Sequence, residues 1–454
     1  MKIIKSRILS GIVMILLLLG CNNKEVHCVD KNELRAPAYP LVTIDPYTNA
    51  WSFGDNLYDS SLKHWTGQDF PLIGVVKVDG VPYRFMGIED YDPMMSTNGD
   101  VPGLSTEGDS MSYFTQTARQ LSVDVQPTRT IYQFVCGPVQ LDLTFIAPLL
   151  MDDLELVARP VNYLSYEMNT DDGQMHNVEL YIEVSPHWAM NLSNQSSVSE
   201  TFTKDGFVFL KSGTKQQNIL GTKGDDVRID WGYFYLGTDR HNTLAAVGNR
   251  NTLRENFLKG NTDFYASAAN TKGENQRMAL VCSLGTIRKS EGRFLIGYDD
   301  IFSIQYFGEN LRPYWNRKGT ETILSQFHKA NSDYEKLMKK CIAFDYQLMK
   351  EATEAGGRRY AELCALAYRQ AISAHKLVEA PNGDLLFLSK ENSSNGSIGT
   401  VDITYPSAPL FLLYNPELVK GMLNPIFYYS ESGRWTKPFA AHDIGTYPLA
   451  NGQT

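Results

Sequence analysis

Two polar segments near the end of the chain, 381–406 and 430–454, hold the side chains best suited to hydrolytic chemistry. Together they contain acids, bases and aromatic rings, namely Lys390, Glu391, Asp402, Tyr405, Glu431, Arg434, Trp435, His442 and Asp443. Cleavage of an amide or a glycosidic bond needs one group that activates water and another that protonates the leaving atom. Two carboxylates in different environments can supply both. Asp402 and Asp443 are therefore the first catalytic candidates.

The other members of this set have either a chemical or a structural interpretation. The further catalytic candidates are Glu391 and His442, and the substrate-binding candidates are Tyr405, Arg434, Trp435 and Lys390. Asp402 precedes a helix and Glu391 lies among Asn and Ser residues, so turn or capping roles suit both equally well. His442 either orients a base or forms a structural hydrogen-bond pair with Asp443. Arg434 and Trp435 could form a wall on which the substrate stacks. Alternatively, Trp435 is a packed residue that anchors its loop.

Common catalytic and cofactor-binding motifs are absent from the sequence. The eight histidines are scattered without an HExxH pattern, and there is no P-loop, GxGxxG or GxSxG motif. The six cysteines are widely spaced without a CxxC pair, so neither a zinc site nor a disulfide framework is indicated. The formal charge of −9, with no basic run after the first residues, argues against nucleic acid. We expect a small-molecule substrate, no metal, no cofactor and no nucleic-acid partner.

The candidate residues lie between segments with a helical period. A capping box at 332–335 predicts the start of a first helix, and the glycines at 356–357 predict its end. A second helix is expected over 358–377 and a short one over 407–414, and Asn415-Pro416 predicts the start of another. These four helices form two hairpins.

Helix parity places the two polar segments together. In an up-down array, the loops after the second and the fourth helix leave from the same end. Segments 381–406 and 430–454 should therefore face each other. We expect this end of the hairpins to hold Asp402 and Asp443, with Tyr405 and His442 near them and Trp435 at the rim.

The chain before about residue 320 has the period-two pattern of half-buried strands. Apolar residues alternate with polar ones over 139–145 and 178–184. Asp79-Gly80, between two alternating runs, predicts a hairpin turn. Further strands are expected at 207–210, 227–236 and 293–296. Many short antiparallel strands with turn signals between them predict a large β-sandwich.

The first residues have the pattern of a bacterial lipoprotein signal. Lys2, Lys5 and Arg7 precede an apolar run at 12–19, which is shorter than the roughly 20 residues a membrane-spanning helix needs. The run ends in Leu-Leu-Gly followed by Cys21, the pattern at which processing attaches diacylglycerol to the thiol. The alternative is an ordinary secretory signal with a chance cysteine.

Lipidation of Cys21 would make that residue the mature N-terminus. Each buried CH₂ of an acyl chain contributes about 0.8 kcal/mol, so several chains form an effectively permanent anchor. We therefore expect a membrane-anchored lipoprotein of the outer membrane, facing either the periplasm or the cell surface.

Long segments in both parts of the chain resemble the glutaminase A family. In the first part the matching motifs are Trp51–Leu57, His64–Gln68 and Val78–Gly87. In the second part they are Lys390–Gly396, Thr400–Pro406, Glu431–Trp435 and His442–Pro448. They occur in the order of the family and cover nearly all of the mature chain.

The resemblance implies a large antiparallel β-sandwich followed by an incomplete α/α toroid of the six-hairpin type. The implied domains are a lipoprotein signal and tether over 1–28, the sandwich over 29–320 and a partial six-helical-hairpin domain over 321–454. The implied function is that of an exported hydrolase that converts L-glutamine to L-glutamate and ammonia.

Fold does not determine substrate, so two alternatives stay open. One is a glycoside hydrolase of the six-hairpin type, which would use the same two loops on a sugar. The other is a carbohydrate-binding surface lipoprotein that uses exposed aromatic rings, namely Trp51, Trp65, Trp188 and Trp231.

Members of the family continue past the last residue of this sequence, into an acidic Glu-Glu motif and further hairpins. We interpret the chain as truncated, with two of six hairpins and with open flanks that expose Leu412, Leu413, Met422, Ile426 and Phe427. Each exposed side chain forgoes about 1.5 to 3 kcal/mol of burial, against a net stability of roughly 5 to 15 kcal/mol. We expect a loose helical part and little or no activity of this form by itself.

Overall fold

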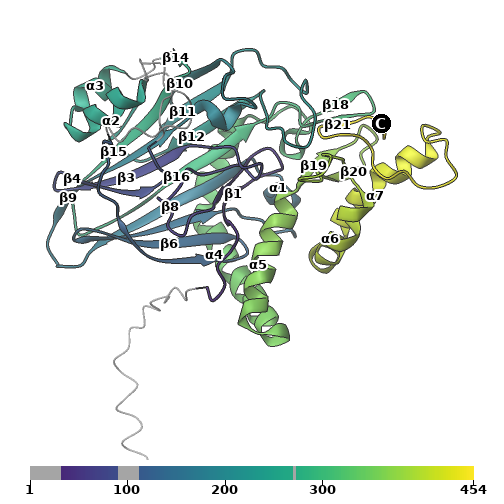
Figure 1. The fold of residues 1–454 in the computed structure, drawn as a ribbon, viewed down its shortest axis with the longest axis horizontal. Coiled ribbons are helices and arrows are strands. Elements are labelled where there is room, and N and C mark those ends of the chain that lie inside the picture. Colours follow the sequence, from purple (N-terminus) through teal and green to yellow (C-terminus); the bar gives the residue numbers. More distant parts are fainter. Residues whose placement is uncertain (1–31, 90–111, 269–271, 454) are drawn as a thin grey trace, which may run out of the picture. The chain divides into compact units, whose positions relative to one another are not determined.

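The computed structural model describes residues 32–89, 112–268 and 272–453 (Figure 1). The expected signal sequence and Cys21 lie outside these residues. The chain from Asn32 onward is one compact unit. Within the described ranges, none of the helices combines the length and apolar character that crossing a membrane requires.

A nine-stranded antiparallel sheet is the largest element of the fold. Its strands follow the order β14-β10-β11-β12-β16-β8-β7-β6-β5. Their bounds are β5 Arg119–Val125, β6 Arg129–Cys136, β7 Val139–Ile146, β8 Val161–Thr170, β10 Ser197–Lys204, β11 Phe207–Thr214, β12 Tyr233–Thr238, β14 Lys272–Glu274 and β16 Lys289–Asp299. The sequence pattern located β7, β11 and β16 correctly.

A second antiparallel sheet has five strands in the order β13-β15-β9-β3-β4. Their bounds are β3 Leu72–Val78, β4 Val81–Met86, β9 His176–Val184, β13 Thr243–Gly248 and β15 Arg277–Ile287. Asp79 and Gly80 both have positive φ and join β3 to β4, as the sequence predicts. Leu141 and Phe145 of one sheet share a buried core with Leu180 and Val76 of the other. The two sheets therefore form the expected β-sandwich.

Two short helices cover the outer face of the five-stranded sheet. These are α2 (Arg250–Leu258) and α3 (Thr262–Ser267). Tyr181 of β9 packs with Phe257 of α2, and Glu183 pairs with the buried Arg254 at 2.7 Å. The expectation that β9 is half-buried is therefore wrong, because helices later in the chain cover its second face.

A 34-residue helix, α4 (Ile323–Gly356), packs on the outer face of the nine-stranded sheet. Phe327 and Leu337 lie among aromatic residues of that sheet, in the same buried cluster as Phe209. The helix begins with a capping box formed by Thr322 and Ser325. The predicted start at 332 is wrong, whereas the predicted end is confirmed: Gly357, with φ of 83°, follows the helix.

The remaining helices follow α4 in the order α5 (Arg358–Ser373), α6 (Val401–Tyr414) and α7 (Pro416–Glu431). Between α5 and α6 the chain forms a β-hairpin, β19 (His375–Glu379) and β20 (Leu385–Ser389), which the sequence reading took in part for helix. Asn415 accepts the backbone N–H of Glu417 and caps α7, as predicted.

Several short elements complete the described chain. They are β1 Tyr39–Thr43, β2 Asn49–Ser52, β17 Ile304–Tyr306, β18 Glu309–Leu311, β21 Leu449–Ala450, α1 Leu154–Val157 and the 3₁₀ helices η2 Pro186–Ala189 and η3 Tyr314–Asn316. β21 pairs in parallel with β17 and ties the last described segment to the region directly after the sandwich.

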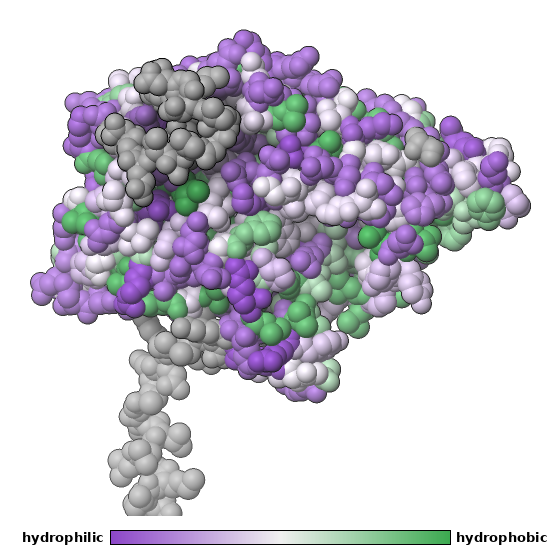
Figure 2. All heavy atoms as spheres, viewed as in Figure 1, coloured by the Kyte–Doolittle hydropathy of each residue, from purple (hydrophilic) through white to green (hydrophobic). Residues whose placement is uncertain are grey.

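Helices α6 and α7 carry large apolar residues on their surface. Leu412, Leu413 and Phe427 are 54%, 74% and 55% exposed, and exposure was expected for all three side chains. Figure 2 shows apolar residues among polar ones over this part of the surface. Met422 is buried instead, because it packs with Phe387 of β20, and Ile426 is partly buried.

Candidate functional site

The two loops that hold the candidate residues lie against each other. Loop 390–400 joins β20 to α6, and loop 432–448 follows α7. Ile398 donates its backbone N–H to Gly445 at 2.8 Å, and Ile444 donates to Ile398 at 3.1 Å. Ser397 and Thr446 form an antiparallel bridge between the same loops. The juxtaposition expected from helix parity is therefore present.

His442 lies between two carboxylates that differ in exposure. Its Nδ1 is 2.9 Å from Asp443 Oδ2, and its Nε2 is 3.7 Å from Asp402 Oδ2. Asp443 is buried and also accepts the backbone N–H of Gly445, whereas Asp402 stands in the first turn of α6 with 73% of its side chain exposed. The hydrogen bond that His442 donates to Asp443 raises the pKa of His442, which favours the imidazolium form.

Glu391 supplies a third carboxylate to this group. Its negative charge contributes to the raised pKa of His442. Its Oε2 atom is buried and has no hydrogen-bond partner within the described parts of the chain. Buried polar atoms without a partner are rare and each calls for an explanation. We call Glu391, Asp402, His442 and Asp443 the histidine–carboxylate cluster.

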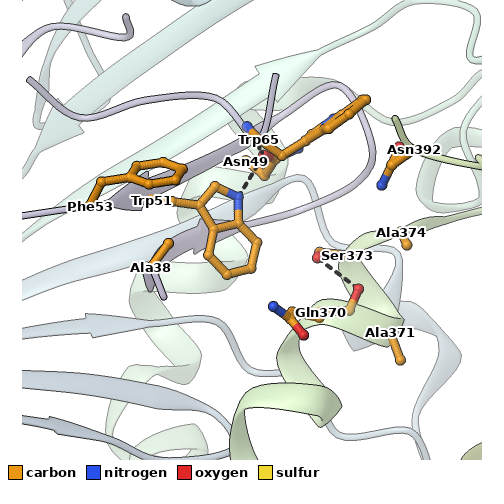
Figure 3. Close-up of a pocket in the computed structure, with 10 residues that line it drawn as sticks. All are labelled: Ala38, Asn49, Trp51, Phe53, Trp65, Gln370, Ala371, Ser373, Ala374 and Asn392. Atoms are coloured by element: carbon orange, nitrogen blue, oxygen red, sulfur yellow. Dashed lines mark hydrogen bonds between the residues drawn. The ribbon is translucent and has the colours of Figure 1, made fainter. Parts of the chain in front are cut away.

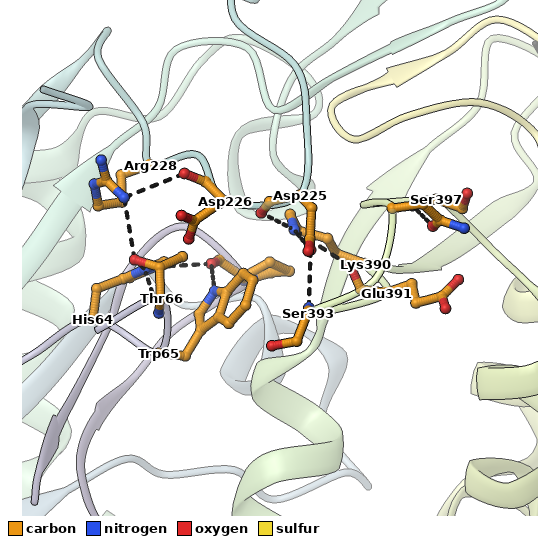
Figure 4. Close-up of polar contacts among 12 residues, drawn as sticks. His64, Trp65, Thr66, Asp225, Asp226, Arg228, Lys390, Glu391, Ser393 and Ser397 are labelled. Atoms are coloured by element: carbon orange, nitrogen blue, oxygen red, sulfur yellow. Dashed lines mark hydrogen bonds and ion pairs between the residues drawn. The ribbon is translucent and has the colours of Figure 1, made fainter. Parts of the chain in front are cut away.

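The structure gives Lys390 surroundings that differ from those of a substrate-binding residue. Its side chain is fully buried, and Nζ donates to the backbone oxygen of Asp225 at 2.6 Å. Nζ also lies 4.5 Å from the ring centre of Trp65. Burial lowers the pKa of Lys390 to about 8. In Figure 4 the side chain turns toward Asp225, while the Glu391 carboxylate points away from Trp65.

Arg434 and Trp435 belong to an aromatic group next to β17. Arg434 lies 5.1 Å from the ring centre of Phe307, and Trp435 contacts the rings of Tyr429 and Phe439. The indole N–H of Trp435 donates to the Phe439 carbonyl. These contacts fit the loop-anchor interpretation of Trp435. Tyr405 is 81% exposed on α6, and Glu431 is exposed at the end of α7.

A loop of the sandwich, residues 215–232, also reaches the site and was not predicted from the sequence. A strand was expected over 227–236, but β12 begins only at Tyr233. Within this loop Asp225 accepts the N–H of Ser393 at 3.0 Å and pairs with Lys390. The signal for it was the length of the connection, because loops longer than about 12 residues are uncommon and are usually either functional or disordered.

Gly396 makes the close approach of this loop possible. A Cβ atom there would lie 2.5 Å from the backbone oxygen of Gly224, and the φ of Gly396 is 70°. Both observations exclude an ordinary side chain. Gly396 of the family-like motif is therefore needed where loops 215–232 and 390–400 meet.

The motif that begins at His64 packs beside the same loops without forming an exposed reactive group. His64 is fully buried, its Nε2 lies 3.1 Å from the Pro46 oxygen and its Nδ1 lies 3.0 Å from Thr66 Oγ1. Burial lowers the pKa of His64 to about 3, so this ring is neutral. Arg228 donates to the same Thr66 oxygen at 3.2 Å (Figure 4). This group links the N-terminal segment to loop 215–232.

Trp188 and Trp231, considered above as stacking platforms, are 1% and 0% exposed. Both pack inside the sandwich core and cannot contact a ligand from solvent. In the described residues, no group of three or more His, Cys, Asp or Glu side chains is arranged to hold a metal ion.

The fold and the cluster define a class of protein that joins an N-terminal antiparallel sandwich to a C-terminal region of helical hairpins. Residues 357–454 match the model of the glutaminase A six helical-hairpin domain. Residues 128–351 and 14–96 match two domains of unknown function, DUF5127 and DUF4964.

Two curated relatives extend the match over most of the chain. Glutaminase A of Aspergillus oryzae is 27% identical over 441 residues, which cover 92% of this chain and 60% of the relative. A probable glutaminase of Arthroderma benhamiae is 23% identical over 453 residues, which cover 92% of this chain and 49% of the relative. Together these matches support a glutaminase A-like family for the chain. It spans about half to three fifths of the length of these relatives.

Solved structures show more distant likenesses. A protein from the human microbiome assigned as a kojibiose phosphorylase has a TM-score of 0.43 and 8% identity, covering 91% of this chain and 49% of its own. The heparan sulfate lyase HepC from Pedobacter heparinus has a TM-score of 0.21 and 7% identity, covering 40% of this chain and 22% of its own.

Proposed function

We propose that the protein is a glutaminase-like hydrolase that cleaves the side-chain amide of L-glutamine to L-glutamate and ammonia. The observation that carries the proposal is the histidine–carboxylate cluster, in which His442 contacts two carboxylates and lies near a third. The names of the two curated relatives support the choice of glutamine. Amide hydrolysis needs a base for water and an acid for the departing amine, and this cluster contains candidates for both.

Each member of the cluster has a distinct part in this proposal. Glu391, with its unpaired Oε2, accepts the proton of the attacking water. His442, whose imidazolium form is favoured by its raised pKa, donates a proton to the departing ammonia. Asp443 is a positioning residue, because both of its oxygens are used within the protein by Gly445 and His442. Asp402 adds negative charge from the exposed side of the imidazole.

The test combines turnover with a measurement that does not need turnover. Ammonia release from L-glutamine is measured for the protein and for Glu391→Gln and His442→Gln, with Glu417→Gln on the exposed start of α7 as the matched control. Loss of one general acid or base should lower the rate about 10²- to 10⁴-fold. In parallel, L-glutamine is titrated against the His442 imidazole resonance. Release of reducing sugar from glycans without any response to glutamine would contradict the proposal and favour a glycosidase.

We also propose that the protein is an exported lipoprotein anchored through Cys21 in the outer membrane. The support is the sequence pattern of the first residues alone, a positive region and a short apolar run that ends in Leu-Leu-Gly-Cys. Cys21→Ala should move the protein from the membrane fraction to the soluble fraction, and Cys28→Ala should leave it in place. A Cys21→Ala protein that still sediments with membranes after a carbonate wash would disprove lipid anchoring.

A further inference from the structure

A cavity of about 430 Å³ lies between the N-terminal segment and the end of α5 (Figure 3). Its walls include Trp51, Phe53, Trp65, Gln370, Ser373 and Asn392. The volume lies within the roughly 300 to 1,000 Å³ of typical small-molecule sites. Asn392 follows Glu391 directly, so the cavity adjoins loop 390–400 without containing any member of the histidine–carboxylate cluster.

The aromatic wall of the cavity is fixed in position. The indole N–H of Trp51 donates to Asn49 Oδ1 at 2.8 Å, and that amide is itself held by backbone oxygens of Asp45 and Pro46. The indole N–H of Trp65 donates to the Pro46 oxygen at 3.1 Å. In Figure 3 the six-membered ring of Trp51 faces the end of α5 across the cavity. A ring held in this way loses little conformational entropy when a ligand stacks on it.

Two side-chain amides of the cavity are neutral and free. The side-chain amides of Gln370 and Asn392 have no partner among the described residues, and both residues are exposed. Each amide offers donors and acceptors together. They come from two elements, α5 and loop 390–400, on the side of the cavity opposite the Trp51 ring. Neutral hydroxyl groups, which both donate and accept, match such partners.

The lining itself favours an uncharged ligand. None of the described residues that form this cavity is Asp, Glu, Lys, Arg or His. A free amino acid would bring an ammonium and a carboxylate, and a charge removed from water without a partner is strongly disfavoured. A pyranose ring has one apolar face for stacking and a rim of neutral hydroxyl groups. We propose that this cavity is a binding site for one unit of a neutral saccharide, separate from the site for glutamine.

The test measures binding of neutral disaccharides to the full chain by saturation-transfer NMR and calorimetry. The disaccharides are those of glucose, galactose, mannose and N-acetylglucosamine. At least one should bind saturably. Gln370→Ala should weaken that binding about fivefold through the loss of one hydrogen bond. Trp51→Leu should weaken it roughly tenfold or more. Gln116→Ala, an exposed glutamine of the sandwich that does not line the cavity, should leave it unchanged within about twofold.

Trp51 is buried, so circular dichroism and thermal melting accompany each variant. If Trp51→Leu does not fold, the two substitutions of Gln370, to Ala and to Lys, still test the proposal. Gln370 lies on the exposed surface of α5, so neither substitution affects a core contact. The proposal is overturned if no disaccharide of the panel binds saturably, or if Gln370→Ala binds as the unchanged protein does. It is also overturned if a glutamine-containing peptide, rather than a saccharide, is the ligand that these variants weaken. Saccharide binding without ammonia release would support this binding site. The same result would contradict the glutaminase proposal, so the two proposals can fail independently.

Discussion

His442 shows how neighbouring side chains set the charge of one residue. Asp443 provides a direct hydrogen bond, and Asp402 and Glu391 add negative charge nearby. Because these contacts favour the imidazolium form, His442 keeps its proton to a higher pH than a free histidine with a pKa of about 6.5. A step that needs the imidazolium therefore slows as the pH rises through this raised pKa.

Asp443→Asn should lower the pKa of His442 and move the alkaline limb of any His442-dependent activity to lower pH. Asparagine keeps an oxygen for the Gly445 N–H but removes the negative charge. The pKa is measured by NMR titration of histidine-labelled protein, with His442→Gln to assign the resonance. His176, whose pKa is raised by Asp79, serves as an internal control and should not change. An unchanged His442 titration would show that Asp443 does not hold its proton.

The elements that carry the site are positioned by local turn chemistry and by what they pack on. α4 begins directly after Thr322, because the Thr322 side chain accepts the N–H of Ser325 and the Ser325 side chain accepts the N–H of Thr322. The residues that follow include Phe327, which is buried on the nine-stranded sheet. Ser332 lies inside the same helix on its exposed side and has no capping role.

Thr322→Ala should lower the free energy of unfolding by about 0.5 to 2 kcal/mol, because an N-terminal N–H of α4 loses its acceptor. Ser332→Ala is the matched control and should change it by less than about 0.5 kcal/mol, since alanine is the better helix former at an exposed interior position. Urea denaturation followed by circular dichroism measures both. If Ser332→Ala lowered the free energy of unfolding more than Thr322→Ala, the capping box at 332–335 would be the one that stabilises the helix.

At the scale of the whole described unit, a buried ion network joins three distant parts of the chain. Lys376 of β19 lies 2.6 Å from Asp45, between β1 and β2, and 2.7 Å from Asp300, directly after β16. Although burial opposes its charge, the two carboxylates raise the pKa of Lys376 above its ordinary value. Asp45 also accepts the backbone N–H groups of Tyr47 and Thr48, so its remaining oxygen is satisfied.

Lys376→Met should lower the free energy of unfolding by about 3 to 5 kcal/mol, because it leaves two buried carboxylates without their cation. Lys420→Met is the matched control: Lys420 pairs with Glu417 on the exposed surface of α7 and should change stability by less than about 1 kcal/mol. Guanidinium denaturation, monitored by tryptophan fluorescence and by circular dichroism, measures both. Equal effects of the two substitutions would show that the network does not hold the unit together.

Local patterns in the sequence determined those features that depend on neighbouring residues. The Asp79-Gly80 turn, the end of α4 at Gly357 and the start of α7 at Asn415 follow from backbone preferences and capping within a few residues. The alternation over β7 predicted its buried face correctly. Helix parity was enough to place loops 390–400 and 432–448 together, because the number of helices between two loops decides at which end they leave.

Only the tertiary structure decided which surfaces are covered and which polar groups are free. β9 is buried on both faces because α2 and α3, which lie about 70 to 85 positions later in the sequence, pack on its outer face. The periodicity within a strand does not show what packs on that strand. Lys390 became a buried partner of Asp225, 165 positions away, instead of a group open to substrate. Loop 215–232 enters the site by the same kind of contact. Burial and charge pairing are properties of residues brought together from distant positions, and a local pattern contains no record of that approach.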